Sequence, residues 1–219
     1  ISENEINVRG FVLEVVKNKN DLWDLRVNFH KDISNLIKEV RTLSSLEMDR
    51  MIDVKIRGII LEACDIYPLA VSLIESIKTY NRVLASLDDF IRPLAATEIK
   101  MIQSKLSEGF NWPWKAANLD GYCKELYDSV TRFQSTVSNL ISINNKIKVY
   151  LDELKTCKTN RKALIDGIEN IQKLVDDVTL EEAYSNRKYW VRDLNKLIES
   201  ILLTRLQDLL STWITEYSI

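Results

Sequence analysis

A heptad row of mostly apolar residues in the second half of the chain limits its possible folds more than any other feature. The row runs from Leu119 to Leu154 in alternating steps of four and three residues, which places all its members on one stripe of a long helix. Its members are Leu119, Cys123, Leu126, Val130, Phe133, Val137, Leu140, Asn144, Ile147, Leu151 and Leu154. We interpret the stripe as the core face of an antiparallel bundle rather than a free-standing coiled coil, because it is short and contains cysteine and an aromatic residue. Asn144 either fixes the register of this packing or faces a solvated edge.

Helical periodicity also covers most of the chain between His30 and this row, and the chain after it. Only five glycines and three prolines interrupt 219 residues, which favours long helices. We expect Asp32 to cap a first helix, Pro68 to begin a new helix, and Arg92-Pro93 to separate the next pair. The further helices are predicted at about 52–66, 94–108, 161–178 and 187–216.

The N-terminal residues follow a different pattern. Residues 23–29 (WDLRVNF) alternate strictly between apolar and polar side chains, as a half-buried strand does. A second apolar run occupies 10–16, and the intervening KNKND at 17–21 is rich in residues that tolerate turns. These features predict a β-hairpin, which needs helices to pack against.

We therefore predict an all-α fold of consecutive antiparallel helical bundles in an elongated array, preceded by a short β-hairpin. The expected divisions are 1–30 for the hairpin and lead-in, 31–108 for a first helical sub-bundle, 109–118 for a tryptophan-rich junction and 119–219 for a second sub-bundle. Within the junction, Gly109 is expected to end one helix and Pro113 to prevent its continuation. Asn118 or Asp120 then caps the next helix.

The sequence contains no recognisable reaction centre. Its five glycines lack the spacing of a phosphate-binding or dinucleotide-binding loop, and its single histidine, His30, is interpreted as a helix-entry residue. Acidic pairs such as Asp88-Asp89 fall at predicted helix ends, where solvated carboxylates are common. We predict no catalytic residue, no cofactor, no metal site and no small-molecule substrate.

Charge and cysteine content limit the partners and the compartment. The net charge of -2 provides no basic field for nucleic acid or an acidic membrane, and no apolar run approaches the roughly 20 residues that span a bilayer. Three widely spaced cysteines indicate reduced thiols in the cytosol. The N-terminus does not resemble a secretory signal, and because the chain begins with Ile1 rather than Met we expect a piece of a longer protein.

Two tryptophans in the junction are the candidate binding residues. Trp112 and Trp114 lie in GFNWPWKAANLDGYC, a stretch that also contains Gly109 and Pro113. Large rings at such a break cover the apolar ends of helices, and this core-filling role is the default interpretation. The functional alternative is a protein-binding anchor, because tryptophan is enriched at interface hot spots.

Three segments resemble the tails of dynein heavy chains, and of the cytoplasmic class in particular. They are WDLRVNFHKDISNLIKEVRTLSSL, YPLAVSLIESIKTYNRVL, and the region from KALIDGIENIQKLVDDV through NRKYWVRDLNKLIESILLTRLQDLLSTW. Asn118, Asp120 and Tyr122 match the N-x-D-x-Y with which a helix of that family opens. The chain departs from the family in LEMDRMI at 46–52, where relatives often have Gly or Pro.

The resemblance implies a non-catalytic helical scaffold in a minus-end-directed microtubule motor of the cytoplasm. It implies roles in dimerisation with a second heavy chain and in docking the dynein intermediate chain, the light intermediate chain, dynactin and cargo adaptors. One alternative is a helical tethering or spectrin-like structural protein, which leaves the hairpin unexplained. Another is a helical enzyme that uses His30 and a cysteine, for which a low-pKa thiol would be diagnostic.

Overall fold

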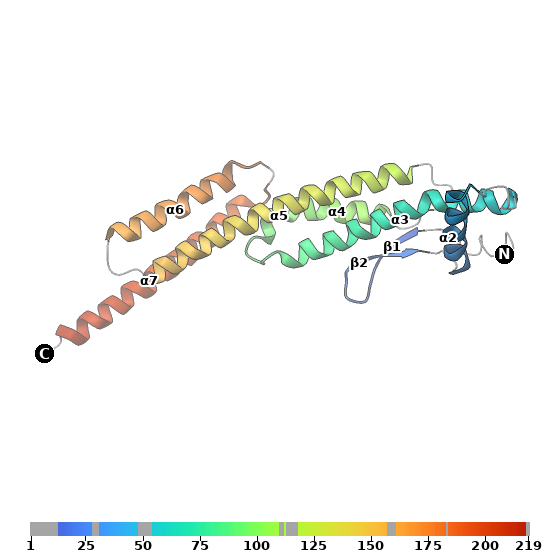
Figure 1. The fold of residues 1–219 in the computed structure, drawn as a ribbon. Helices are drawn as coiled ribbons and strands as arrows, with labels where there is room; N and C mark the ends of the chain where they lie inside the picture. The colour runs from blue at the N-terminus through green and yellow to red at the C-terminus, as the bar shows by residue number, and fades with distance from the viewer. Residues whose placement is uncertain are drawn as a thin grey trace. The chain divides into compact units, whose positions relative to one another are not determined.

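A computed structural model of the chain gives a mainly helical fold with a short N-terminal β-hairpin, so the predicted fold class is confirmed (Figure 1). Residues 13–27, 31–47, 54–109, 112, 118–156, 161–182 and 184–217 are described. The described elements are β1 (Leu13–Lys17), β2 (Trp23–Val27), α2 (Lys31–Ser45), α3 (Val54–Ser86), the 3-10 helix η2 (Arg92–Ala95), α4 (Ala96–Glu108), α5 (Leu119–Thr156), α6 (Arg161–Leu180) and α7 (Arg187–Tyr217). The segment 48–53, which contains most of the departure from the family pattern, lies outside the described residues.

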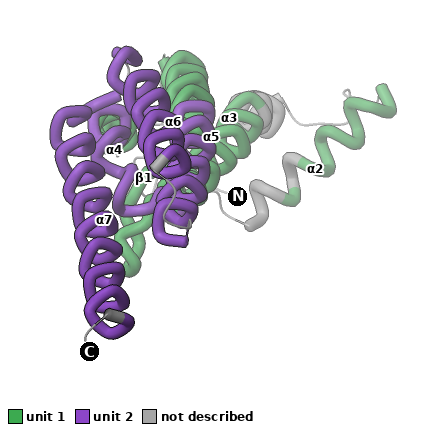
Figure 2. Tube along the Cα trace, turned by 90° about the vertical axis from the view of Figure 1, so that its left-hand side faces the viewer, with its two compact units in different colours: residues 1–85, 100–134 green, residues 86–99, 135–219 purple. Residues whose placement is uncertain are grey.

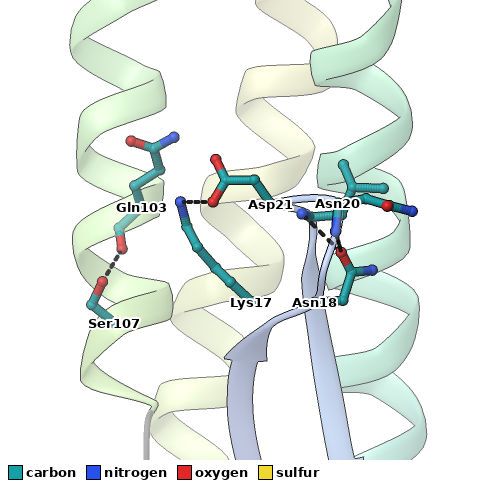
Figure 3. Close-up of polar contacts among 7 residues, drawn as sticks. Lys17, Asn18, Asn20, Asp21, Gln103 and Ser107 are labelled. Carbon is teal, nitrogen blue, oxygen red and sulfur yellow. Dashed lines mark hydrogen bonds and ion pairs between the residues drawn. The ribbon is translucent and has the colours of Figure 1, made fainter.

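The hairpin is closed by its own turn residues. β1 and β2 pair antiparallel from Leu13 opposite Val27 to Lys17 opposite Trp23. In the turn, Asn18 Oδ1 accepts the backbone N–H groups of Asn20 at 2.9 Å and Leu22 at 3.1 Å (Figure 3). An asparagine side chain that accepts backbone N–H groups in this way stabilises a tight turn.

Helix α3 continues through Pro68, so the prediction of a new helix at this proline is wrong. A proline inside a helix removes one backbone hydrogen bond and crowds the preceding turn, at a cost of about 3 kcal/mol. The helix continues because one face is buried on both sides of the proline. The buried residues on this face are Ile66, Ala70, Leu73, Ile77 and Tyr80.

The next break lies where the sequence predicted it. Pro93 is in the first turn of η2, and α4 follows without a gap and ends at Glu108, directly before Gly109. Ahead of η2, Asp88 Oδ1 accepts the backbone N–H of Phe90 at 3.0 Å. This bond organises the turn between α3 and η2.

Helix α5 buries the whole heptad row, from Leu119 at 3% exposure to Leu154 at 1%. The interpretation of the row as a core stripe is therefore confirmed, and Asn144, also buried, does not face a solvated edge. Asn118 occupies the N-cap, because its carbonyl accepts the first helical N–H from Tyr122 at 3.1 Å, whereas Asp120 lies in the first turn.

The turn between α6 and α7 is bonded to the segment around η2. Ser185 donates its backbone N–H to the carbonyl of Leu94 at 2.7 Å, and the Asn186 amide donates to the carbonyl of Pro93 at 3.0 Å. Asn186 has a φ of 52°, in the left-handed region that asparagine tolerates better than most residues. Phe90 and Trp190 pack beside this contact, with ring centroids 5.9 Å apart.

The chain divides into two compact units that interleave in sequence (Figure 2). The first contains residues 1–85 and 100–134, and the second contains residues 86–99 and 135–219. Both α4 and α5 therefore contribute residues to each unit. The predicted division of the chain into sub-bundles at 109–118 stays a prediction.

Candidate docking surface at Trp112

Trp112 is held against the hairpin by backbone hydrogen bonds. Its N–H donates to the carbonyl of Leu13 at 2.9 Å, and the N–H of Leu13 donates back to the Trp112 carbonyl at 3.5 Å. The N–H of Val15 donates to the carbonyl of Gly109 at 3.1 Å. The edge of β1 that does not face β2 is therefore bonded to the stretch that contains Gly109 and Trp112, which fixes the position of the indole.

The indole packs on Tyr122 from the first turn of α5. The two ring centroids are 5.0 Å apart at an angle of 45°, an arrangement typical of favourable aromatic pairs. Tyr122 is itself buried, and its hydroxyl donates to the carbonyl of Lys105 at 3.0 Å in the last turn of α4. Burial raises the pKa of Tyr122, so the hydroxyl stays protonated and remains a donor.

Gly109 allows these groups to come together. A Cβ at this position would lie 2.2 Å from Tyr122 Oη and 2.9 Å from Val15 Cγ2. Both distances are shorter than carbon contacts allow, so the close approach of the helix end, the tyrosine and β1 requires glycine.

Trp112 is half-buried, so part of its surface remains available. Its Nε1 is buried and has no hydrogen-bond partner among the described residues. Trp112 thus shares features of both interpretations, because one face supports Tyr122 while part of the side chain reaches the surface. Trp114, the other candidate, lies outside the described residues.

Only some of the residues that the enzyme hypothesis requires lie among the described residues. His30 and Cys157 lie outside the described residues, as does the side chain of Cys64. Cys123 is buried, with its Sγ 3.9 Å from the carbonyl of Leu69. Burial, assisted by the charge of Asp120, raises the pKa of the Cys123 thiol to about 11, which is opposite to the shift that activates a nucleophilic cysteine.

Each carboxylate of the acidic pair Asp88-Asp89 lies near a basic side chain. Lys148 Nζ lies 2.6 Å from Asp88 Oδ2, and Arg92 Nε lies 3.7 Å from Asp89 Oδ1. Hydrogen bonds from Lys148 and from the Phe90 N–H hold the pKa of Asp88 below its ordinary value, and the nearby Asn144 side chain lowers it slightly further. Within the described ranges, no group of three or more His, Cys, Asp and Glu residues is arranged to hold a metal ion.

The described residues form a mainly helical segment in which Trp112 is a partly accessible aromatic residue at a helix junction. None of its described helices is long and apolar enough to cross a membrane. Residues 3–122 match the family described as dynein heavy chain, N-terminal region 1. The chain therefore belongs to the dynein heavy-chain family, as the resemblance indicated.

Individual relatives extend the similarity over nearly the whole chain. A protein named "Dynein heavy chain, cytoplasmic" from Dictyostelium discoideum is 34% identical over 213 residues, which covers 97% of this chain and 4% of that protein. The Drosophila melanogaster protein of the same name is 34% identical over 210 residues, covering 94% of this chain and 4% of its own length. The Paramecium tetraurelia protein of that name is 32% identical over 218 residues, which covers 99% of this chain and 5% of that protein. The chain thus spans about a twentieth of the length of these relatives.

Proposed function

We propose that this chain is a tail segment of a cytoplasmic dynein heavy chain and acts as a non-catalytic helical scaffold. The observation that carries the proposal is the match of residues 3–122 to the N-terminal region of that family, together with relatives of this name along nearly the whole chain. In this proposal the motor activity belongs to other parts of a minus-end-directed microtubule motor. The segment works in the cytoplasm on the microtubule cytoskeleton.

The partners we propose are a second heavy chain, the dynein intermediate and light intermediate chains, dynactin and cargo adaptors. A net charge of -2 favours recognition through desolvated aromatic and apolar residues over recognition through a broad electrostatic field. Trp112 and Trp114 are the proposed anchors. The half-buried indole of Trp112 supports this choice, because hydrogen bonds to Leu13 hold it in place while part of it stays accessible.

The test is alanine substitution of each tryptophan in heavy chain reconstituted with intermediate and light intermediate chains. If the tryptophans are anchors, Trp112→Ala and Trp114→Ala keep the helical circular dichroism signal and a cooperative melting transition but weaken subunit binding at least tenfold. Tyr127→Ala is the matched control, because Tyr127 is a 54% exposed aromatic residue on α5 and its loss should change neither property.

Core filling gives a different outcome. Each tryptophan variant then destabilises the chain by about 3–5 kcal/mol, and no folded, binding-defective state is found. Trp112→Phe separates the two roles further, because phenylalanine keeps an aromatic ring at this position but is smaller than tryptophan and lacks the indole N–H. Normal binding by a folded Trp112→Phe variant would show that docking does not require the indole of Trp112.

A further inference from the structure

The C-terminal half of α7 exposes an apolar surface. Its side chains are between 44% and 62% exposed, although leucine, isoleucine and tryptophan normally bury much of their area. We call these residues the outer face of α7: Leu203, Leu206, Leu209, Leu210, Trp213 and Ile214. Four of them, with Thr212 and Glu216, line a shallow groove along the helix.

The outer face points away from the side that α7 buries in its own unit. Trp190, Leu194 and Ile201 are buried in the first half of the helix. Ile201 and Leu210 are nine residues apart, which is about two and a half turns at 3.6 residues per turn, so their side chains project in opposite directions. The helix thus carries two apolar stripes on opposite sides, one in each half.

Helix α7 also continues past the end of α5. The Arg205 guanidinium donates to the carbonyl of Leu154, in the last turn of α5, which ends at Thr156. Figure 1 shows α7 running on past the end of α5. From Arg205 to Tyr217 this extension is about 18 Å long at 1.5 Å per residue. Most of the outer face lies on this extension, where α5 cannot cover it.

The pattern of the outer face indicates what kind of structure would cover it. Leu203, Leu206, Leu210 and Trp213 follow steps of three, four and three residues, which is a heptad seam. The positions that flank such a seam carry charged residues in a two-stranded coiled coil, yet here Leu209 and Ile214 flank it. The apolar arc from Leu209 to Ile214 spans about 140° at about 100° per residue, a width typical of a helix packed into a bundle core.

We propose that the outer face of α7 forms one side of a further helical bundle, completed by a helical segment of the same heavy chain that lies outside this sequence. The inference rests on the proposed function, because a tail segment that spans only 4% of its relatives has most of their length from which such a segment can come. The two opposite stripes let α7 belong to two consecutive cores. A continuous helix shared in this way keeps neighbouring bundles from bending at a loop.

Hydrogen exchange tests the proposal in the 219-residue chain and in the full-length heavy chain that contains it. Backbone amides at 203–217 should exchange at least tenfold more slowly in the full-length protein, because a packed helix opens less often than an exposed one. The double variant L206E/L210E should abolish this extra protection in the full-length protein. The control S211E/T215E introduces the same charges at exposed positions on the opposite side and should leave the protection intact.

Three results would overturn the inference. The first is equal exchange rates at 203–217 in the two proteins. The second is a discrete dimer of the 219-residue chain, seen by light scattering, that L206E/L210E dissolves and S211E/T215E leaves intact, because a second copy would then cover the face. The third is protection that develops only after an accessory subunit is added. Subunit binding by the Trp112 variants is measured separately, so failure of the proposed function is distinguishable from failure of this inference.

Discussion

Trp112 and Leu13 exchange two backbone hydrogen bonds, at 2.9 and 3.5 Å, and so connect the junction between α4 and α5 to the N-terminal hairpin. A hairpin of two short strands is only marginally stable in water. Here the third bonded segment, together with the Asn81 amide that donates to the carbonyl of Trp23 at 2.7 Å, secures both strands. The geometry of the candidate docking residue therefore depends on the hairpin.

Gly109→Ala should destabilise the first unit by about 1–3 kcal/mol, because the added methyl group collides with Tyr122 and Val15. Urea denaturation followed by circular dichroism measures the free energy of unfolding. Gly121→Ala is the control, since its Cβ would meet only the movable Asn118 side chain and alanine favours a helix. Equal stability of the Gly109→Ala variant and the unaltered chain would show that the close approach at Gly109 is wrong.

Phe133→Ala should cost about 3–5 kcal/mol, because Phe133 is fully buried and packs on Tyr80 with ring centroids 5.7 Å apart. Leu140→Ala, also in the buried row, should cost about 2–5 kcal/mol. Arg132→Ala changes an exposed neighbour on the same helix and should stay within about 0.5 kcal/mol. A melting temperature unchanged by Phe133→Ala would refute the assignment of the buried face.

Asn144→Leu should change the free energy of unfolding by no more than about 1 kcal/mol. The loss of the favourable polar contact with Asp88 and the burial of the larger apolar leucine side chain act in opposite directions on this free energy. NMR titration should find the pKa of Asp88 raised toward its ordinary value, because Asn144 helps to hold it down. Asn145→Leu, at the exposed neighbouring position, should leave that pKa unchanged. A decrease of more than about 3 kcal/mol in the free energy of unfolding would mean that Asn144 specifies how α5 packs in the core.

Asp88→Asn should lower the free energy of unfolding at pH 7 by about 0.2–1 kcal/mol, the range of partly exposed ion pairs. The folded-state pKa of Asp88 lies below the ordinary 3.8, so its stabilising contribution is complete above that pH and is lost as the pH falls through the lowered value. The difference in free energy of unfolding between the original chain and Asp88→Asn should therefore disappear on acidification below pH 3.8. Denaturation curves collected from pH 7 downward test this, and a gap that widens in acid would contradict the assigned contacts.

Local signals in the sequence were sufficient wherever one element decides its own structure. The heptad row predicted the buried face of α5, from Leu119 to Leu154, because periodicity is a property of the helix alone. Alternation in residues 23–29 and the turn residues after Lys17 predicted the hairpin in the same way. Pro68 was misread because the local penalty of proline is outweighed by the long buried face of α3, which no short window contains.

The candidate site was predictable only as a set of residue types. The sequence marked Gly109, Trp112 and Trp114 as unusual neighbours at a helix break, and Tyr122 only through the family motif. It gave no sign that Leu13 and Val15 would bond to this stretch, because strand pairing between distant segments leaves no mark on local periodicity. Likewise, periodicity predicted the last helix at 187–216, whereas the exposure of its leucines depends on where α5 ends.

The sequence by itself determined the helical class, the hairpin, the position of the helix breaks near Pro93 and Gly109, and the family. These follow from spacing, turn chemistry and residue order, which are read along the chain. The tertiary structure decided that α3 continues through Pro68, that Asn144 is buried near Asp88, and that α4 and α5 each serve two compact units. Such outcomes depend on which distant surfaces meet and how much apolar area they bury together, and that free energy belongs to the packed molecule rather than to any one segment.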